Sequence, residues 1–149
     1  MKFQVLLGCA AVVISAGFVM AQEEEAPQVT RQEAMKAVGQ SMGVAGKMAK
    51  GETEFNTASL LQAFTTMNEV SLVYGNMFPP GSETGFETEA SPKIWEDPEG
   101  FNAALSQFQN AIAGALDANP TNAQELGTVL GPLGKSCGDC HETYRIKKS

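Results

Sequence analysis

The sequence is short of the residues on which most enzyme active sites and nucleic-acid surfaces depend. Its 149 residues include a single histidine, and ten Lys and Arg residues stand against 17 Asp and Glu residues, for a formal net charge of −7. A single histidine excludes most catalytic triads. An acidic chain without a basic run argues against nucleic acid and anionic membranes as partners. Walker-type loops, dinucleotide-binding glycine motifs and internal repeats are also missing, so any special chemistry must come from a small group of residues.

The first 21 residues have the pattern of a cleaved secretory signal peptide. Lys2 gives a short positive start, residues 5–19 are apolar, and Ala21 ends a small-residue cleavage site. The apolar stretch is too short for a membrane span. An alternative lipoprotein cleavage box, "LLGC", would leave an apolar stretch of only a few residues. We therefore expect residues 22–149 to form one mature periplasmic domain without a membrane span.

Apolar residues recur at helical spacing in four segments, and no segment alternates with the period of two that marks a strand. The first predicted helix begins at a capping box, "TRQE" at 30–33, and ends at Gly51. The second covers about residues 55–74, and a Pro/Gly-rich loop follows over 76–90. Loops of this length in a compact domain usually carry function.

A third helix is predicted to begin at Ser91 and Pro92, and the sequence "NP" at 119–120 is predicted to end it and to start a fourth. Pro132 interrupts the fourth helix and predicts a local kink. The apolar face of that helix carries Leu126, Leu130, Leu133, Cys137, Cys140 and Tyr144. Four amphipathic helices with three connections predict an all-α fold, an antiparallel four-helix bundle.

The side chains best able to bind a cofactor or metal lie in "CGDCH", near the end of the fourth predicted helix. Cys137 and Cys140 lie on its inward face, and His141 follows one turn after Cys137. Two thiols can form thioether bonds to the vinyl groups of a haem, and the adjacent imidazole can bind its iron. The spacing C-x-x-C-H is that of a c-type haem attachment. Export supports this interpretation, because covalent haem attachment of this kind takes place outside the bacterial cytoplasm.

Three other interpretations of the motif fit the sequence less well than haem attachment. Zinc requires four ligands, whereas the mature chain offers three Cys and His side chains within five residues. A thiol–disulfide redox pair usually lies where a strand meets a helix, and no strand is predicted. A structural disulfide would close a very small loop and stabilise little. Only eight residues follow His141, and none is Met or His, so any sixth iron ligand must come from upstream.

Taken together, these motifs resemble the class II cytochromes c, a family that includes the cytochromes c′ and c-556. The resemblance covers nearly all of the mature chain and lies in residues 31–52, 77–85, 91–97 and 133–145, the last containing "LGKSCGDCHETYR". It implies a periplasmic four-helix bundle with one covalent haem c and its iron near the C-terminus. It also implies single-electron transfer to other redox proteins of the periplasm, with no enzymatic activity.

The resemblance points to Met35, four residues after Arg31, as the position opposite His141 on the iron. In cytochromes c′ this side chain usually does not bind iron, which leaves a five-coordinate centre that takes nitric oxide or carbon monoxide. In the c-556 type a methionine binds there and makes the iron six-coordinate. "MKAVG" at 35–39, "SPKIW" at 91–95 and Pro132 resemble the c-556 type more. By itself, Met35 could equally be a core residue, because Met commonly fills gaps in apolar interiors.

Two arginines match family positions at the haem edge. The resemblance implies that Arg31 and Arg145 pair with the haem propionates; ordinary solvated side chains are the alternative. Lys135, Lys147 and Lys148 lie near the motif as well. Cations suit the C-terminus of a helix, and the same cluster could steer an acidic redox partner. Family members often form homodimers through the first two helices, although no second apolar face is visible in the sequence.

Overall fold

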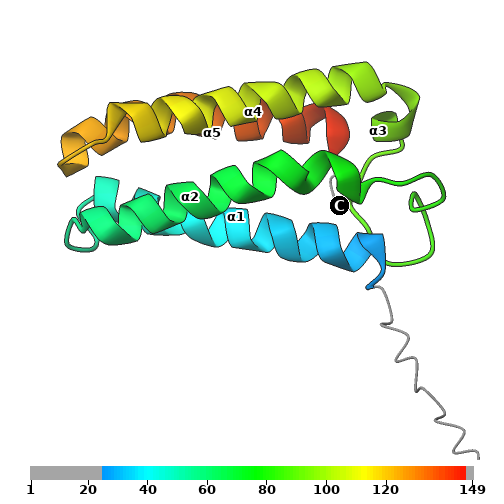
Figure 1. Cartoon of the computed structure of the whole chain (residues 1–149), viewed down its shortest axis with the longest axis horizontal. Helices are drawn as coiled ribbons and strands as arrows, with labels where there is room; N and C mark the ends of the chain where they lie inside the picture. The colour runs from blue at the N-terminus through cyan, green and yellow to red at the C-terminus, as the bar shows by residue number, and fades with distance from the viewer. Residues whose placement is uncertain (1–24, 147–149) are drawn as a thin grey trace, which may run out of the picture.

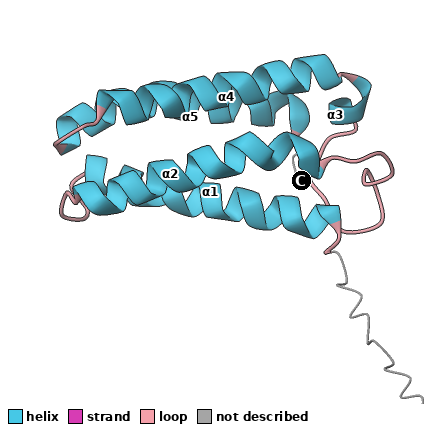
Figure 2. Cartoon of the chain, viewed as in Figure 1, coloured by secondary structure: helices cyan, strands magenta, loops and turns pink. Residues whose placement is uncertain are grey.

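The computed structural model describes residues 25–146, and these form helices joined by loops (Figure 2). The elements are α1 (Pro27–Ala49), α2 (Thr57–Tyr74), the single 3-10 turn η1 (Gly75–Met77), α3 (Lys93–Glu96), α4 (Pro98–Ala118) and α5 (Ala123–Tyr144). Within this part of the chain there is no β-strand, and one isolated bridge joins Ala90 to Arg145. No helix of residues 25–146 has the length and apolar character needed to cross a membrane. The predicted signal peptide lies outside the described residues.

The four long helices run alternately in opposite directions along one axis (Figure 1). α1 packs against α2 and α5, and α4 packs against α5 and α2, so each long helix has two neighbours. The loop after η1, α3, the start of α1 and the end of α5 gather at one end of the bundle. This arrangement confirms the predicted all-α antiparallel four-helix bundle, and it places "CGDCH" at the end that the loop covers.

Two groups of buried side chains fill the interior. The larger group is mainly aliphatic and includes Met48, Leu60, Phe64, Met67, Ile112, Leu126 and Leu133. The smaller group lies at the loop end and is built on Ile94, Phe101 and Tyr144, with Tyr74, Phe78 and Trp95 packed against it. Cys140 contacts this aromatic group, whereas Cys137 packs against the larger one. The attachment motif therefore lies at the boundary between the two groups.

The start of α1 differs from the prediction. The helix begins at Pro27 after Ala26, three residues before the predicted cap Thr30, whose hydroxyl instead lies within hydrogen-bonding distance of the Ala26 carbonyl oxygen. Proline at the first helical position has its φ already set for the helix and lacks only an N–H that would have no partner there. Glu33 pairs with Lys36 on the surface and forms no capping box. The extra turn brings Gln28 into α1.

The end of α1 is as predicted. Gly51 has a φ of +71°, and its N–H bonds to the Met48 carbonyl while the N–H of Glu52 bonds to the Lys47 carbonyl. This pair of bonds is the Schellman motif, which favours glycine because its central residue is left-handed. α1 is thereby closed before Asn56 caps α2.

The predicted third helix is divided into two. Ser91 and Pro92 begin only the four-residue α3, and a second start at Asp97 and Pro98 opens the long α4. Proline disfavours the helical conformation in the residue before it, and Asp97 has an extended φ of −135°. The Asp97 carboxylate then accepts a hydrogen bond from the N–H of Gly100, as an N-cap should.

The end of α4 agrees with the prediction, whereas α5 begins three residues after Pro120 and not at the predicted "NP". α4 ends at Asn119, which is left-handed with a φ of 42°, directly before Pro120. Asn122 caps α5 by accepting from the N–H groups of Gln124 and Glu125. α5 is helical on both sides of Pro132. The kink at Pro132 stays a prediction.

Candidate functional site

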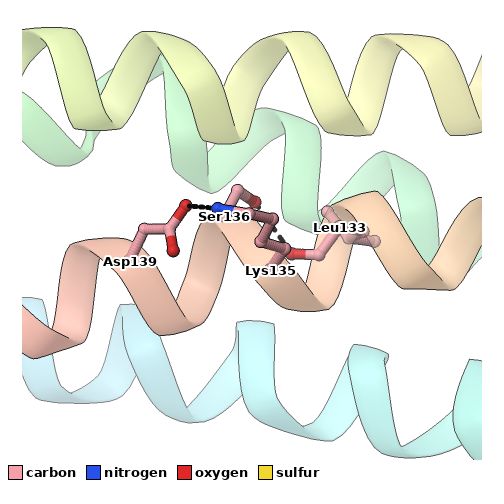
Figure 3. A network of polar contacts seen from close by, with 4 residues as sticks. All are labelled: Leu133, Lys135, Ser136 and Asp139. Carbon is pink, nitrogen blue, oxygen red and sulfur yellow. Dashed lines mark hydrogen bonds and ion pairs between the residues drawn. The ribbon is translucent and has the colours of Figure 1, made fainter.

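Cys137 and Cys140 are both free thiols and both half-buried on α5. The helix carries them between α4 and α1, as Figure 3 shows for the preceding turn. There the buried Ser136 donates its hydroxyl to the Leu133 carbonyl, 2.8 Å away, so this polar side chain is satisfied within its own helix. The sulfur atoms are the groups on this side of α5 that a covalent partner could reach.

His141 lies on the exposed side of α5, in a shallow hollow beside Glu89, Lys135, Asp139 and Arg145. Partial burial lowers the pKa of His141, the positive charge of Arg145 lowers it further, and Glu89 acts in the opposite direction. A lowered pKa favours the neutral imidazole, which is the form that binds metals. The iron ligation by His141 stays a prediction.

The basic residues near the motif are paired with acidic ones. Lys135 binds Asp139 one turn along α5, with 2.5 Å between nitrogen and oxygen (Figure 3). Arg145 binds Glu89 through its Nε and Nη2 atoms, at 2.7 and 2.5 Å from one carboxylate oxygen. Both pairs are exposed and contribute little to stability. They offset two of the charges that could otherwise steer an acidic partner; Lys147 and Lys148 lie outside the described residues.

The thiols do not have the character of a redox-active pair. Burial is the main cause that raises the pKa of both Cys137 and Cys140 above the ordinary value of a thiol. Reactive cysteines have lowered pKa values, because the thiolate is the nucleophile. Among residues 25–146, no three His, Cys, Asp or Glu side chains are placed to hold a metal ion together. Two neutral thiols three residues apart, next to an imidazole, fit a c-type haem attachment.

Met35 lies on the facing helix. It is partly buried in α1 and packs against the same aliphatic group as Cys137. α1 and α5 are direct neighbours in the bundle. The predicted sixth ligand and one of the attachment thiols therefore pack against the same buried group from neighbouring helices.

Arg31 occupies an unusual place for an arginine, since only 3% of its surface is exposed. Its Nη2 donates to the Ser82 carbonyl at 2.8 Å and to the Thr88 hydroxyl at 3.0 Å, and its Nη1 donates to the Ser82 hydroxyl at 3.1 Å. The guanidinium also lies over the rings of Phe78 and Trp95, 5.1 and 5.5 Å from their centres. We call Arg31 and these four residues the Arg31 cage.

The Arg31 cage contains no carboxylate. Burial lowers the pKa of Arg31, but guanidinium groups remain charged in proteins. Its Nε is buried and has no hydrogen-bond partner among residues 25–146. The charges of Tyr74 and Glu83 act on Arg31 from outside the cage and oppose the effect of burial on its pKa. The propionate contact of Arg31 stays a prediction.

A second set of contacts holds the end of α5. The Tyr144 carbonyl accepts from the N–H of Ser91, and the N–H of Ile146 donates to the Glu89 carbonyl at 2.7 Å. The Tyr144 hydroxyl donates to the Asp97 carboxylate at 3.2 Å. This set ties the turn after His141 to the loop and to the first turn of α4.

Several residues of the site could not be singled out from the sequence. Ser82, Phe78 and Thr88 belong to a loop without periodicity, and Trp95 stood out only as part of "SPKIW". The one usable signal was the length of the loop over 76–90, which predicts a functional segment without indicating a partner.

Comparison with known proteins gives consistent results. A family model described as Cytochrome C′ matches residues 27–145. Cytochrome c-556 of Agrobacterium fabrum is 37% identical over 140 residues, covering 94% of this chain and 88% of that protein. Cytochrome c′ of Rhodopseudomonas palustris is 32% identical over the full length of both chains. A solved structure of cytochrome c′ from Rhodopseudomonas palustris superposes with a TM-score of 0.79 at 28% identity, covering 85% of this chain and all of that one.

Proposed function

The chain belongs to the cytochrome c′ family of class II cytochromes c, and from this we propose that it carries single electrons in the periplasm through an iron bound by His141 and Met35. Its cofactor is haem c with iron. We propose attachment through thioether bonds at Cys137 and Cys140. The observation that carries the proposal is that Met35 and Cys137, on neighbouring helices, pack against one group of buried side chains.

The chemistry of this ligand set suits electron transfer. A haem iron with His and Met ligands is stable in both oxidation states, and the thioether raises its reduction potential relative to two imidazoles. The chain supplies the ligands, fixes the two thioether bonds on one helix and keeps water from the Met35 side with aliphatic neighbours. His141 lies at the exposed edge, which favours exchange of electrons at that face. We therefore propose an electron carrier and no enzymatic reaction.

A second function has support of its own. Cytochrome c′ of Rhodopseudomonas palustris matches the whole chain, and Met35 packs against the aliphatic group as a core residue would. If Met35 serves as a core residue, the iron is five-coordinate and high-spin and takes nitric oxide or carbon monoxide.

One pair of variants decides between the two functions. Met35→Ala should convert a six-coordinate, low-spin spectrum into a high-spin one that shifts when carbon monoxide is added to the reduced protein. Met42→Ala is the matched control, since Met42 is also half-buried on α1 and packs against the same group. The proposal fails if Met35→Ala leaves the spectrum as it was, or if Met42→Ala changes it equally.

Export, redox partners, propionate contacts and dimer formation are part of the same proposal. We infer export by cleavage after Ala21 and partners among other periplasmic redox proteins. Contacts of Arg31 and Arg145 with the haem propionates belong to the same proposal; in the described structure their nitrogen atoms bind the loop and Glu89. A homodimer through α1 and α2 is supported by Leu61 and Leu72 of α2, which are 56% and 65% exposed.

A further inference from the structure

We propose that Arg31 is a positioning residue for Met35: the Arg31 cage anchors the first turns of α1 and thereby keeps the Met35 thioether on the iron. The inference rests on the proposed His141 and Met35 ligation. It goes beyond that ligation by naming the contacts that keep the Met35 sulfur on the iron when an external ligand is present.

The first argument is the uneven burial along α1. Before Val38, the only buried side chains of the helix are Gln28 and Arg31, and both are polar. From Val38 onward the helix buries Ala45 and Met48 in the aliphatic group. Met35 therefore lies in the segment that apolar burial holds least, and some other interaction must fix that segment in place.

The second argument is that three polar side chains of the same segment bond to the loop after η1. Gln28 donates from Nε2 to the carbonyls of Ser82 and Thr84, at 3.1 and 2.6 Å, and Gln32 donates to the Glu87 carbonyl at 2.6 Å. Arg31 stands between them with its three bonds to Ser82 and Thr88. One face of α1 is thus bound to the loop by directional bonds, and the cation at its centre makes the strongest of them.

The loop after η1 is itself held by contacts with α3 and α4. Phe78 packs edge-on against Trp95 and Phe101, with ring centres 5.7 and 4.9 Å apart. The Trp95 indole N–H lies 3.4 Å from the Pro79 carbonyl. Arg31 bonds to Ser82 and Thr88 of this loop. Met35 follows Arg31 by one helical turn and lies on the same face of α1.

An external ligand reaches the iron only if the Met35 sulfur moves away. Since the first turns of α1 have little apolar burial, that movement is opposed mainly by the loop bonds. Removing the charged donor should therefore raise the population with Met35 displaced, even though Met35 itself is unchanged. A positioning residue of this kind predicts that carbon monoxide binds more readily to the reduced variant.

The test uses the haem-loaded protein and carbon monoxide as the probe. Reduced Arg31→Gln should bind carbon monoxide at a rate about tenfold or more above the detection limit, at which the native protein shows no binding, as the loss of hydrogen bonds from a charged donor implies. Ser82→Ala and Thr88→Val keep the charge and remove one acceptor each, and should give rises of a few-fold. Lys36→Gln is the matched control, because it removes an exposed cation next to Met35 and should change nothing.

A double-mutant cycle separates positioning from general loosening. In a Met35→Ala background the change Arg31→Gln should give no further increase in carbon monoxide binding, because the residue it acts through is gone. If Arg31→Gln does not fold, Ser82→Ala and Thr88→Val decide the question. Variants that remain as indifferent to carbon monoxide as the native protein would overturn the inference and leave the proposed function standing. Ready binding by the native protein itself would overturn both.

Discussion

The two ends of the bundle are filled by different kinds of side chain. The end farther from the loop is closed by aliphatic side chains such as Ile112 and Leu126, which are fully buried. The loop end is closed by a buried guanidinium, hydroxyl groups, backbone carbonyls and edge-on aromatic rings around Phe78. Aliphatic packing supplies stability without direction, whereas hydrogen bonds and ring contacts fix particular geometries. The end that carries the attachment motif is therefore the one built for positioning.

The largest effect should come from the aliphatic end. Ile112→Ala removes a side chain that is 0% exposed and should lower the free energy of unfolding by about 2–5 kcal/mol, because the cavity cannot fully collapse. Denaturant unfolding of the haem-loaded protein measures this. The native visible spectrum should persist, since Ile112 lies away from the loop end. Leu61→Ala, at a 56% exposed position, is the control and should change stability by about 0.5 kcal/mol or less. Equal losses in the two variants would contradict the comparison.

A smaller effect is expected where α4 begins, at the loop end. A Cβ on Gly100 would lie 2.4 Å from an Asp97 carboxylate oxygen and 2.5 Å from the Tyr144 hydroxyl. Gly100→Ala should therefore cost about 1–3 kcal/mol by overpacking and break the bond between Tyr144 and Asp97. In the same helix, Gly114 has open space around its Cβ position. Gly114→Ala should stabilise the protein by up to about 1 kcal/mol. Thermal unfolding of both variants checks the contrast, which vanishes if they behave alike.

The smallest effect should appear at high pH. Burial raises the pKa of Tyr74, beside the Arg31 cage, from 10.0 to about 12. Between these values the unfolded chain has released the phenolic proton while the folded chain keeps it, so stability falls as pH rises. At pH 11 the loss is about 1.4 kcal/mol, roughly one pKa unit. Tyr74→Phe should remove that part of the decline in urea unfolding between pH 8 and pH 11. An unchanged decline would mean that Tyr74 titrates normally in the folded protein.

The sequence was sufficient for what depends on local patterns. Helical spacing predicted four long helices, Gly51 and Asn119 marked their ends, and the spacing of Cys137, Cys140 and His141 indicated haem. Thr30 was a wrong start for α1, because the proline rule at Pro27 outweighs a capping box. The break before Pro98 was missed, since Ser91 and Pro92 already supplied a plausible start.

The polar half of the site could not be predicted. The burial of Arg31 depends on the carbonyl and hydroxyl groups of Ser82 and on the ring of Phe78, which belong to a loop without a repeating pattern. Backbone carbonyls are present at every position, so no residue type marks those that accept from a buried arginine. Such contacts emerge only once α1, the loop and α3 are placed together in space.

The most direct test of the central claim is the visible spectrum of the native protein purified from the periplasm, oxidised and dithionite-reduced, with and without carbon monoxide. The proposed ligation by His141 and Met35 predicts sharp, split bands on reduction that carbon monoxide leaves unchanged. A broad high-spin spectrum that shifts on addition of carbon monoxide would contradict it and assign Met35 to the core.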